Sequence, residues 1–150
     1  RSYSVTGVQT CALPIYGRWT VAVDGAPWKK TFGDLVTDLV FSPSGRRAAC
    51  VGKENNEYTI AVDGAAWDLK CDMAWAPVFS PDEQSVAARI EKDGRYTVAV
   101  NGKPMKARFK AVWDPAFSPD GEYVLIRAIE EAGGKENYIR QVLPVTEISG

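Results

Sequence analysis

The chain of 150 residues contains no histidine. Histidine is the commonest general base and the commonest metal ligand, so its absence excludes much acid–base enzymology and haem attachment through Cys-x-x-Cys-His. Neither sign of charge is in excess, since 18 Lys and Arg face 19 Asp and Glu for a net charge of -1. This balance argues against a nucleic-acid partner, which requires a basic surface. No apolar run approaches the roughly 20 residues of a membrane span, so no direct membrane span is predicted.

Cysteine is also scarce, with three residues, and one of them lies in a segment that resembles translated DNA. Residues 5–15 match, in order, one reading frame of a DNA sequencing adapter. The sequence therefore predicts that residues 1–16 are non-native, adapter-derived and disordered, with native sequence from about residue 17. The remaining Cys50 and Cys71 lack Cys-x-x-Cys spacing, which is typical of small core residues in a reducing compartment. A disulfide between them is the alternative.

The rest of the chain repeats itself with a period of about 38 residues. Two motifs keep this period together, which indicates a repeat architecture. The first is Phe-Ser-Pro, at 41–43, 79–81 and 117–119. The second is an aromatic residue followed by Thr, alternating apolar residues and Asp-Gly or Asn-Gly, at 19–25, 58–64 and 96–102. This period-2 alternation is typical of strands with one better-buried face.

Turn signals follow each of these strands. Asp-Gly and Asn-Gly tolerate the positive φ of a type I′ turn, so each run is predicted to fold back as a tight hairpin. The Ser-Pro segments predict a second turn, with proline at its first corner and glycine in the left-handed position. In the middle repeat Glu83 replaces that glycine, which is expected to strain or lengthen the turn. Four short strands in about 38 residues match one blade of a β-propeller.

The expected fold is therefore all-β: an open arc of about three four-stranded antiparallel propeller blades, a fragment of a larger propeller. A complete propeller has about four to eight blades. On this interpretation residues 17–150 form the C-terminal part of the propeller. Residues 17–32 form an outer hairpin whose inner strands are missing, and the last blade lacks an outer strand. The predicted blades span 37–71, 75–109 and 113–145.

The motif Phe-Ser-Pro-Asp-Gly between two apolar strands resembles the WD40-like repeat of TolB-type propellers. The chain departs from a true WD40 repeat, because Val62-Asp63 and Val100-Asn101 stand where that repeat has Trp-Asp, and its Gly-His pair is absent. A further resemblance is to the TmcD family, the D subunit of the transmembrane redox complex of sulfate-reducing bacteria. It is carried by the sequences at 21–28, 112–122 and 143–148. Members of this family are accessory, cofactor-free subunits, whereas other subunits of the complex carry haems and iron–sulfur clusters.

Four residues are candidates for partner binding. Trp75 and Trp113 stand four residues before a repeated Phe, where channel aromatics can stack on a partner or pack between blades. Asp38 and Asp114 stand three residues before it. Two carboxylates could bind a cation or share a proton, but Ala76 interrupts the series, which favours solvated charge. The sequence predicts no catalytic, cofactor-binding or metal-binding residue.

These features favour a non-catalytic scaffold. The resemblance implies an accessory subunit of a membrane-associated electron-transfer complex, in contact with cytochrome and iron–sulfur subunits and without a cofactor of its own. It also implies a cytoplasmic location, with membrane association only through partners. Two alternatives remain open: the propeller portion of a prolyl-oligopeptidase-like hydrolase, and a TolB-like periplasmic protein-interaction module. A nucleophile elbow upstream in the gene would favour the first, and a signal peptide would favour the second.

Overall fold

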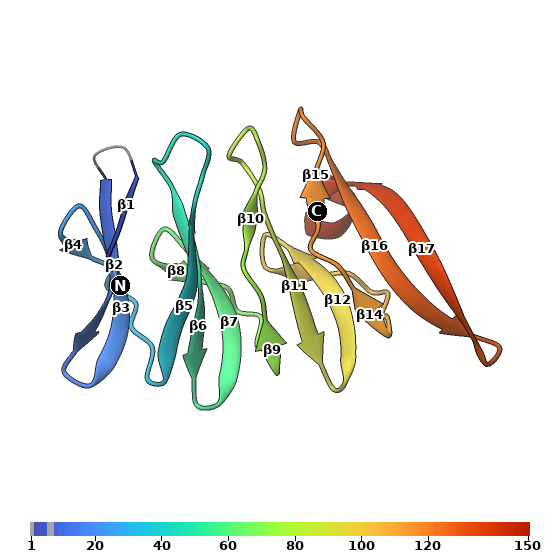
Figure 1. The fold of residues 1–150 in the computed structure, drawn as a ribbon, viewed down its shortest axis with the longest axis horizontal. Coiled ribbons are helices and arrows are strands. Elements are labelled where there is room, and N and C mark those ends of the chain that lie inside the picture. Colours follow the sequence, from blue (N-terminus) through green and yellow to red (C-terminus); the bar gives the residue numbers. More distant parts are fainter. Residues whose placement is uncertain (1, 6–7) are drawn as a thin grey trace.

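The computed structural model describes residues 2–5 and 8–150, with side chains from Tyr16 onward. The chain forms four antiparallel sheets that stand side by side in chain order (Figure 1). Together they make an open arc of β-propeller blades, which confirms the fold class predicted from the sequence. A single short helix, α1 (Val145–Ser149), follows the last strand of the described chain. No helix within the described ranges is long and apolar enough to cross a membrane.

Each sheet is built from consecutive strands, and we name the sheets A to D in chain order. Sheet A contains β1 (Ser2–Val5), β2 (Val8–Ile15), β3 (Arg18–Val23) and β4 (Ala26–Pro27). Sheet B contains β5 (Leu35–Phe41), β6 (Ala48–Glu54), β7 (Glu57–Val62) and β8 (Ala65–Ala66). Sheet C contains β9 (Met73–Ala74), β10 (Val78–Phe79), β11 (Val86–Lys92), β12 (Arg95–Val100) and β13 (Lys103–Pro104). Sheet D contains β14 (Ala111–Val112), β15 (Ala116–Phe117), β16 (Tyr123–Ala132) and β17 (Lys135–Pro144).

The Asp-Gly and Asn-Gly dipeptides form the predicted tight hairpins. Asp63 and Gly64 both have positive φ, at 49° and 85°, and the pairing of β7 with β8 closes directly around them. Asn101 and Gly102 repeat this geometry between β12 and β13. The Asn101 side chain also accepts a hydrogen bond from the Val86 N–H at 2.9 Å. The turn residue therefore anchors the hairpin to the preceding strand.

Proline divides the inner strand of sheets C and D. In sheet B the inner strand β5 is continuous, with a bulge between Thr37 and Val40. Pro77 separates β9 from β10, and Pro115 separates β14 from β15, although both halves pair with the same neighbouring strand. Proline has no N–H to donate to the ladder, which is why pairing lapses at these two positions.

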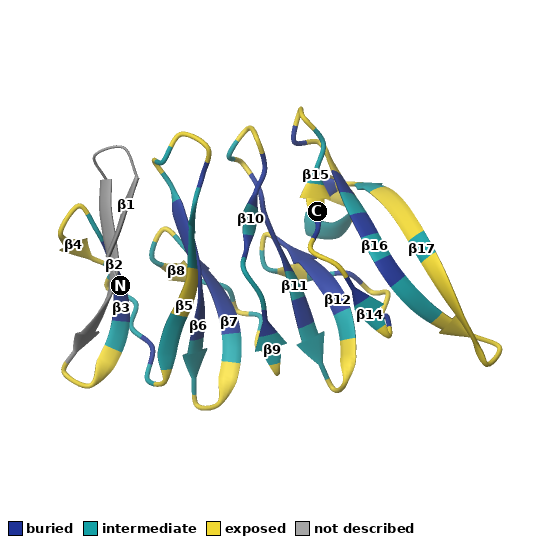
Figure 2. Ribbon diagram, in the orientation of Figure 1, coloured by how far each residue is buried: buried dark blue, intermediate teal, exposed yellow. Residues whose placement is uncertain are grey.

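The apolar core lies between the sheets rather than within any one of them, and the strands in the middle of the stack are the most buried (Figure 2). At each interface one residue near the outer edge of a sheet meets the second strand of the next sheet. Phe32 of the sheet A segment lies over Gly52, where a Cβ atom would come 2.3 Å from its ring. The corresponding residues are Cys71 with Ile90, and Phe109 with Ala128. The bulky Phe32 and Phe109 face the small Gly52 and Ala128, whereas at the B–C interface the small Cys71 faces the bulky Ile90.

A threonine holds the outer segment of each of the first three sheets. The hydroxyl of Thr59 donates to the carbonyl oxygens of Trp67 and Leu69, at 3.0 and 2.7 Å. Thr20 and Thr97 make equivalent contacts in sheets A and C. In sheet D the register places Ile139 at this position, and the described chain has no strand outside β17.

The domain boundaries expected from the sequence stay predictions. Residues 1–16 were expected to be non-native and disordered, and in the structure the backbone of β1 and β2 pairs beside β3. The reason is that β3 offers an edge of unpaired N–H and C=O groups, which any extended segment can pair with. The adapter origin of the segment stays a prediction from the sequence. Pairing in sheets B, C and D also begins at Leu35, Met73 and Ala111, two residues before each expected blade start.

Cys50 and Cys71 are free thiols, both buried in the core. Burial raises the pKa of Cys50 to about 12 and that of Cys71 to about 11. A thiol is a poor nucleophile until it loses its proton, so both residues act as small apolar core groups.

Candidate functional site

The structure brings together three of the four candidate residues from the sequence. Trp75 and Trp113 lie on the inner side of sheets C and D, between the two halves of each inner strand. Their backbone N–H groups donate to the backbone carbonyl oxygens of Arg89 and Arg127, at 3.1 and 3.0 Å. Asp114 follows Trp113 directly. These residues form a site at the inner edge of the C–D interface.

Arg89 connects the two sheets at this site. Its guanidinium carbon lies 4.4 Å from the centre of the Trp75 ring, which is a cation–π contact. Its Nη1 donates to the Val112 carbonyl oxygen at 3.1 Å, and its Nε lies 3.3 Å from Asp114 Oδ1. Asp114 is therefore the acidic partner in an inter-sheet ion pair, although its side chain remains 61% exposed.

The two tryptophans each contact a tyrosine of their own sheet, but with different exposure. The rings of Trp75 and Tyr96 lie 5.9 Å apart, both are partly buried, and Tyr96 packs against the cluster between sheets C and D. The rings of Trp113 and Tyr138 lie 5.6 Å apart in an edge-to-face arrangement. Trp113 is 42% exposed and Tyr138 is 62% exposed. The expected packing role therefore describes Trp75, whereas Trp113 forms part of an open aromatic surface.

Arg127 is the sheet D equivalent of Arg89, 38 residues further along the chain. Its Nη2 donates to the Asp114 carbonyl oxygen at 3.3 Å. Its Nε, like that of Arg89, is buried and has no hydrogen-bond partner among the described residues. Neither arginine was predicted from the sequence as a site residue. Their signal was available, since each lies ten residues after a repeated Phe.

Asp38, the fourth candidate, is not part of this site. It lies in β5 at the bulge of sheet B, with a φ of 51°, and sheet C stands between it and Asp114. The two carboxylates therefore cannot share a cation or a proton. No group of three or more His, Cys, Asp or Glu residues within the described part of the chain could hold a metal ion.

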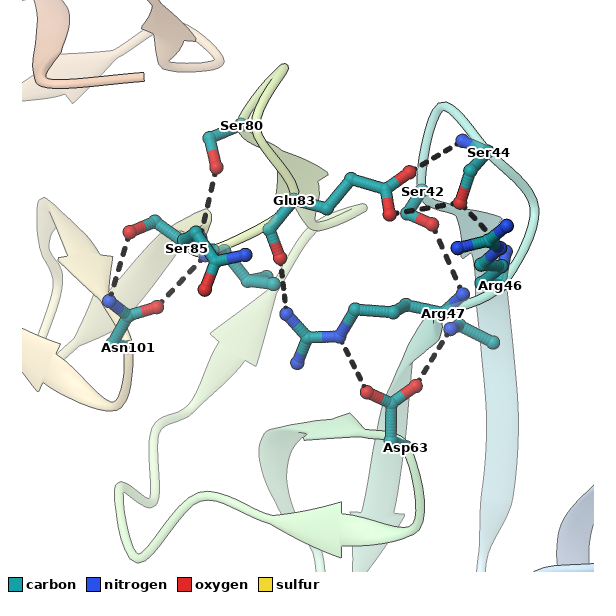
Figure 3. A network of polar contacts seen from close by, with 12 residues as sticks. Ser42, Ser44, Arg46, Arg47, Asp63, Ser80, Glu83, Ser85 and Asn101 are labelled. Atoms are coloured by element: carbon teal, nitrogen blue, oxygen red, sulfur yellow. Dashed lines mark hydrogen bonds and ion pairs between the residues drawn. The ribbon is translucent and has the colours of Figure 1, made fainter. Parts of the chain in front are cut away.

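A polar network links the turns at one end of sheets B and C (Figure 3). The carboxylate of Glu83 accepts hydrogen bonds from Ser44 N at 2.5 Å and from Ser44 Oγ at 2.9 Å. Arg47 donates to the Glu83 carbonyl oxygen and, through Nε, to Asp63 Oδ2 at 2.7 Å. The network ties the Ser-Pro turn of sheet C to the turn and the hairpin of sheet B. It therefore fixes two blades relative to each other outside the apolar core.

Glu83 was expected to strain or lengthen its turn, and the structure confirms only the strain. Its φ is 62°, the left-handed region that glycine occupies in the other two turns. The turn keeps its length, because the Glu83 N–H donates to the Ser80 carbonyl oxygen at 2.9 Å, as Gly45 N–H does to Ser42. The inter-sheet contacts of Glu83 offset the strained backbone.

We expect these carboxylates to make stability fall at acidic pH. The pKa of Glu83 is lowered by hydrogen bonds from Ser44, and that of Glu54 by hydrogen bonds from Arg18 and then Lys30. A carboxylate whose folded-state pKa is lowered stabilises the fold above its unfolded-state pKa, and this is lost as pH falls through the folded-state value. The urea midpoint should therefore fall below about pH 5. Glu83→Gln, which stays neutral, should show a shallower fall, and an unchanged slope would contradict this role.

Comparison with known proteins agrees with this architecture. No protein-family model and no curated protein matches the chain. Among solved structures, the β-propeller domain of the Trilobed protease from Pyrococcus furiosus is similar, with a TM-score of 0.52 and 19% identity over 75% of this chain. TolB from Acinetobacter baumannii is similar with a TM-score of 0.51 and 14% identity over 94% of this chain.

These similarities bear on the fold alone, because the identities are low. The chain spans 40% of the length of the Trilobed protease propeller and 39% of the length of TolB. The similar architecture, together with the repeated hairpins and the inter-sheet core, shows that the chain has the fold of a TolB-type β-propeller, of which it forms an open arc.

Proposed function

We propose that this chain is part of a non-catalytic β-propeller scaffold that binds protein partners. Its binding surface is the open flank of sheet D. The observation that carries the proposal is the exposed edge-to-face pair of Trp113 and Tyr138. Large aromatic side chains and arginine dominate the energetics of protein interfaces.

The equivalent face of sheet C supports this interpretation. There Trp75 and Tyr96 form the equivalent aromatic pair, and Arg89 donates to a carbonyl oxygen and forms an ion pair with a carboxylate of the neighbouring sheet. The flank of sheet D offers the same groups without such a neighbour in the described chain. A further blade of the propeller, or a partner protein that presents a carboxylate and an extended backbone, would complete the contacts of Arg127.

More specifically, we propose that the protein partners of this scaffold are the cytochrome and iron–sulfur subunits of a membrane-associated electron-transfer complex. It is supported by the resemblance of the repeat motifs to the TmcD family. On this proposal the protein carries no cofactor, is cytoplasmic and reaches the membrane only through its partners. The lack of histidine supports a scaffold rather than an enzyme, because the commonest general base is missing from the chain.

Affinity purification of the tagged full-length protein from its native membranes tests this function. We expect cytochrome and iron–sulfur subunits to co-purify with the wild type, and their yield to fall at least about tenfold for Trp113→Ala. Lys29→Ala is the control, because Lys29 is an exposed residue of the sheet A segment, at the opposite end of the described chain. Recovery of the propeller alone in the soluble fraction would contradict the proposal and favour an envelope or hydrolase-linked propeller.

A further inference from the structure

The turn residue of the outer hairpin differs among the repeats. Asp24, Asp63 and Asn101 hold the same repeat position, and a glycine follows each of them. Asn101-Gly102 is the one Asn-Gly sequence in the chain. Asparagine is chemically labile, and it is most labile before glycine, because no side chain shields the glycine nitrogen. The hairpin that joins β12 to β13 therefore carries a candidate site of spontaneous deamidation.

The partner of the turn residue changes together with it. In sheet B the Asp63 carboxylate forms an ion pair with Arg47, whose Nε donates to Oδ2 at 2.7 Å. In sheet C, Ser85 holds the position of Arg47, 38 residues further along. The Asn101 Nδ2 donates to Ser85 Oγ at 3.2 Å, and its Oδ1 accepts from the Val86 N–H (Figure 3). Both ends of the amide are therefore bonded, and the surroundings suit asparagine rather than a carboxylate.

The folded turn keeps Asn101 from reacting. Deamidation begins when the Gly102 nitrogen attacks the Asn101 Cγ atom and closes a five-membered ring. The ring can close only when this nitrogen lies on the same side of the Asn101 Cα–C bond as the Cβ atom. Asn101 has a φ of 49°, and the left-handed conformation places the nitrogen on the opposite side. The reaction therefore requires the hairpin to open and the amide to leave its two hydrogen-bond partners.

We propose that Asn101 is a deamidation site that the folded hairpin protects, so that its modification reports how often the hairpin opens. In the open chain, the Gly102 nitrogen forms a bond to Asn101 Cγ and loses its proton, and the side-chain amide group leaves as ammonia. Water then opens the cyclic imide at either of its carbonyl groups, which gives aspartate or isoaspartate at position 101. Asn101 is exposed, so water reaches it, and no other reactant is required.

The two products differ in their effect on the fold. Aspartate keeps the normal backbone, and Asp63 occupies the same turn with the same positive φ. Isoaspartate instead adds the side-chain methylene to the backbone, which a two-residue turn with two left-handed residues does not accommodate. Trp67 of sheet B packs against this turn, since a Cβ atom at Gly102 would come 3.4 Å from its ring. The isoaspartyl form should therefore lose both the β12–β13 hairpin and its contact with sheet B.

This inference goes beyond the proposed scaffold function, because it concerns a chemical modification of sheet C rather than partner binding at sheet D. Sheet C stands between sheets B and D in the described chain (Figure 1). Loss of its outer hairpin would weaken the arc in the middle, where the strands are most buried.

Mass spectrometry of the full-length protein after prolonged incubation tests the proposal. A synthetic peptide of residues 97–106 gives the rate of deamidation without the fold. The folded protein should deamidate at position 101 at least about tenfold more slowly than this peptide, because only the open fraction reacts. Ser85→Ala removes one partner of the amide and should raise the rate in the folded protein. Equal rates for the wild-type protein and the peptide would overturn the proposal, and an unchanged rate in Ser85→Ala would contradict the role of the amide contacts.

Hydrogen exchange tests the difference between the two products. Asn101→Asp should have the urea midpoint of the wild type and the same slow exchange at residues 103–109. Chains with isoaspartate at position 101, which an endoproteinase specific for aspartate leaves uncut there, should exchange faster in this range. Equal exchange of the two forms would contradict the proposed opening of the hairpin. Capture of electron-transfer subunits by Asn101→Asp should equal that of the wild type, so either proposal can fail without the other.

Discussion

Replacement of Gly52 by alanine is expected to lower the free energy of unfolding by about 2–3 kcal/mol. Gly52 lies within β6, and a Cβ atom there would come 2.3–2.5 Å from three carbon atoms of the Phe32 ring. The ring is 1% exposed and has no free space to move into. In an ordinary strand the same substitution stabilises the protein by about 0.5–1 kcal/mol. The sign of the effect therefore reports the contact between sheets A and B, and urea titration measures it.

Two further variants separate this contact from general effects of the substitution. Gly33→Ala is the matched control, because its Cβ atom would meet no described atom closer than 3.5 Å, and its stability should stay within about 0.5 kcal/mol of the wild type. Phe32→Leu shortens the ring that blocks Gly52. The double variant Phe32→Leu with Gly52→Ala should be more stable than the sum of the single effects implies. Strict additivity would show that the two residues are not in contact.

Phe109→Ala is expected to destabilise the protein by about 3–4 kcal/mol. Phe109 is 3% exposed and packs in the cluster between sheets C and D, which includes Val124, Ile126 and Ala128. Removing the ring opens a cavity in the middle of that interface, and the paired strands on both sides prevent it from closing. Thermal and urea unfolding of the variant should both show the loss.

Trp113→Ala provides the contrasting case for the same interface. Trp113 is 42% exposed, and its described ring contact is with Tyr138 on the open flank. The expected loss is about 1 kcal/mol, the scale of a single edge-to-face pair. A loss as large as that of Phe109→Ala would show that Trp113 is a core residue. The flank of sheet D would then not be the exposed binding surface that the scaffold proposal requires.

The turns and the strand order could be predicted because their determinants are local. Asp63-Gly64 and Asn101-Gly102 direct the chain into a hairpin whatever surrounds them, and the repeat places each hairpin in its sheet. The site was predicted less well. Asp114 forms an ion pair with Arg89 only because sheets C and D pack at a particular angle, and no local pattern encodes that angle. Asp38 resembled Asp114 in sequence position, but Arg89 lies in the sheet before that of Asp114, and β2, the corresponding strand of sheet A, contains no arginine.

The fit of bulky against small residues between the sheets limits how the gene can change. Recombination between repeats readily deletes or duplicates a unit of about 38 residues. Loss of the sheet B unit would bring Phe32 against Ile90, where the present partner is Gly52. Loss of the sheet C unit would bring Cys71 against Ala128 and leave space unfilled. Each repeat is therefore specific to its neighbours, and a viable change in blade number requires compensating substitutions on both sides of the new junction.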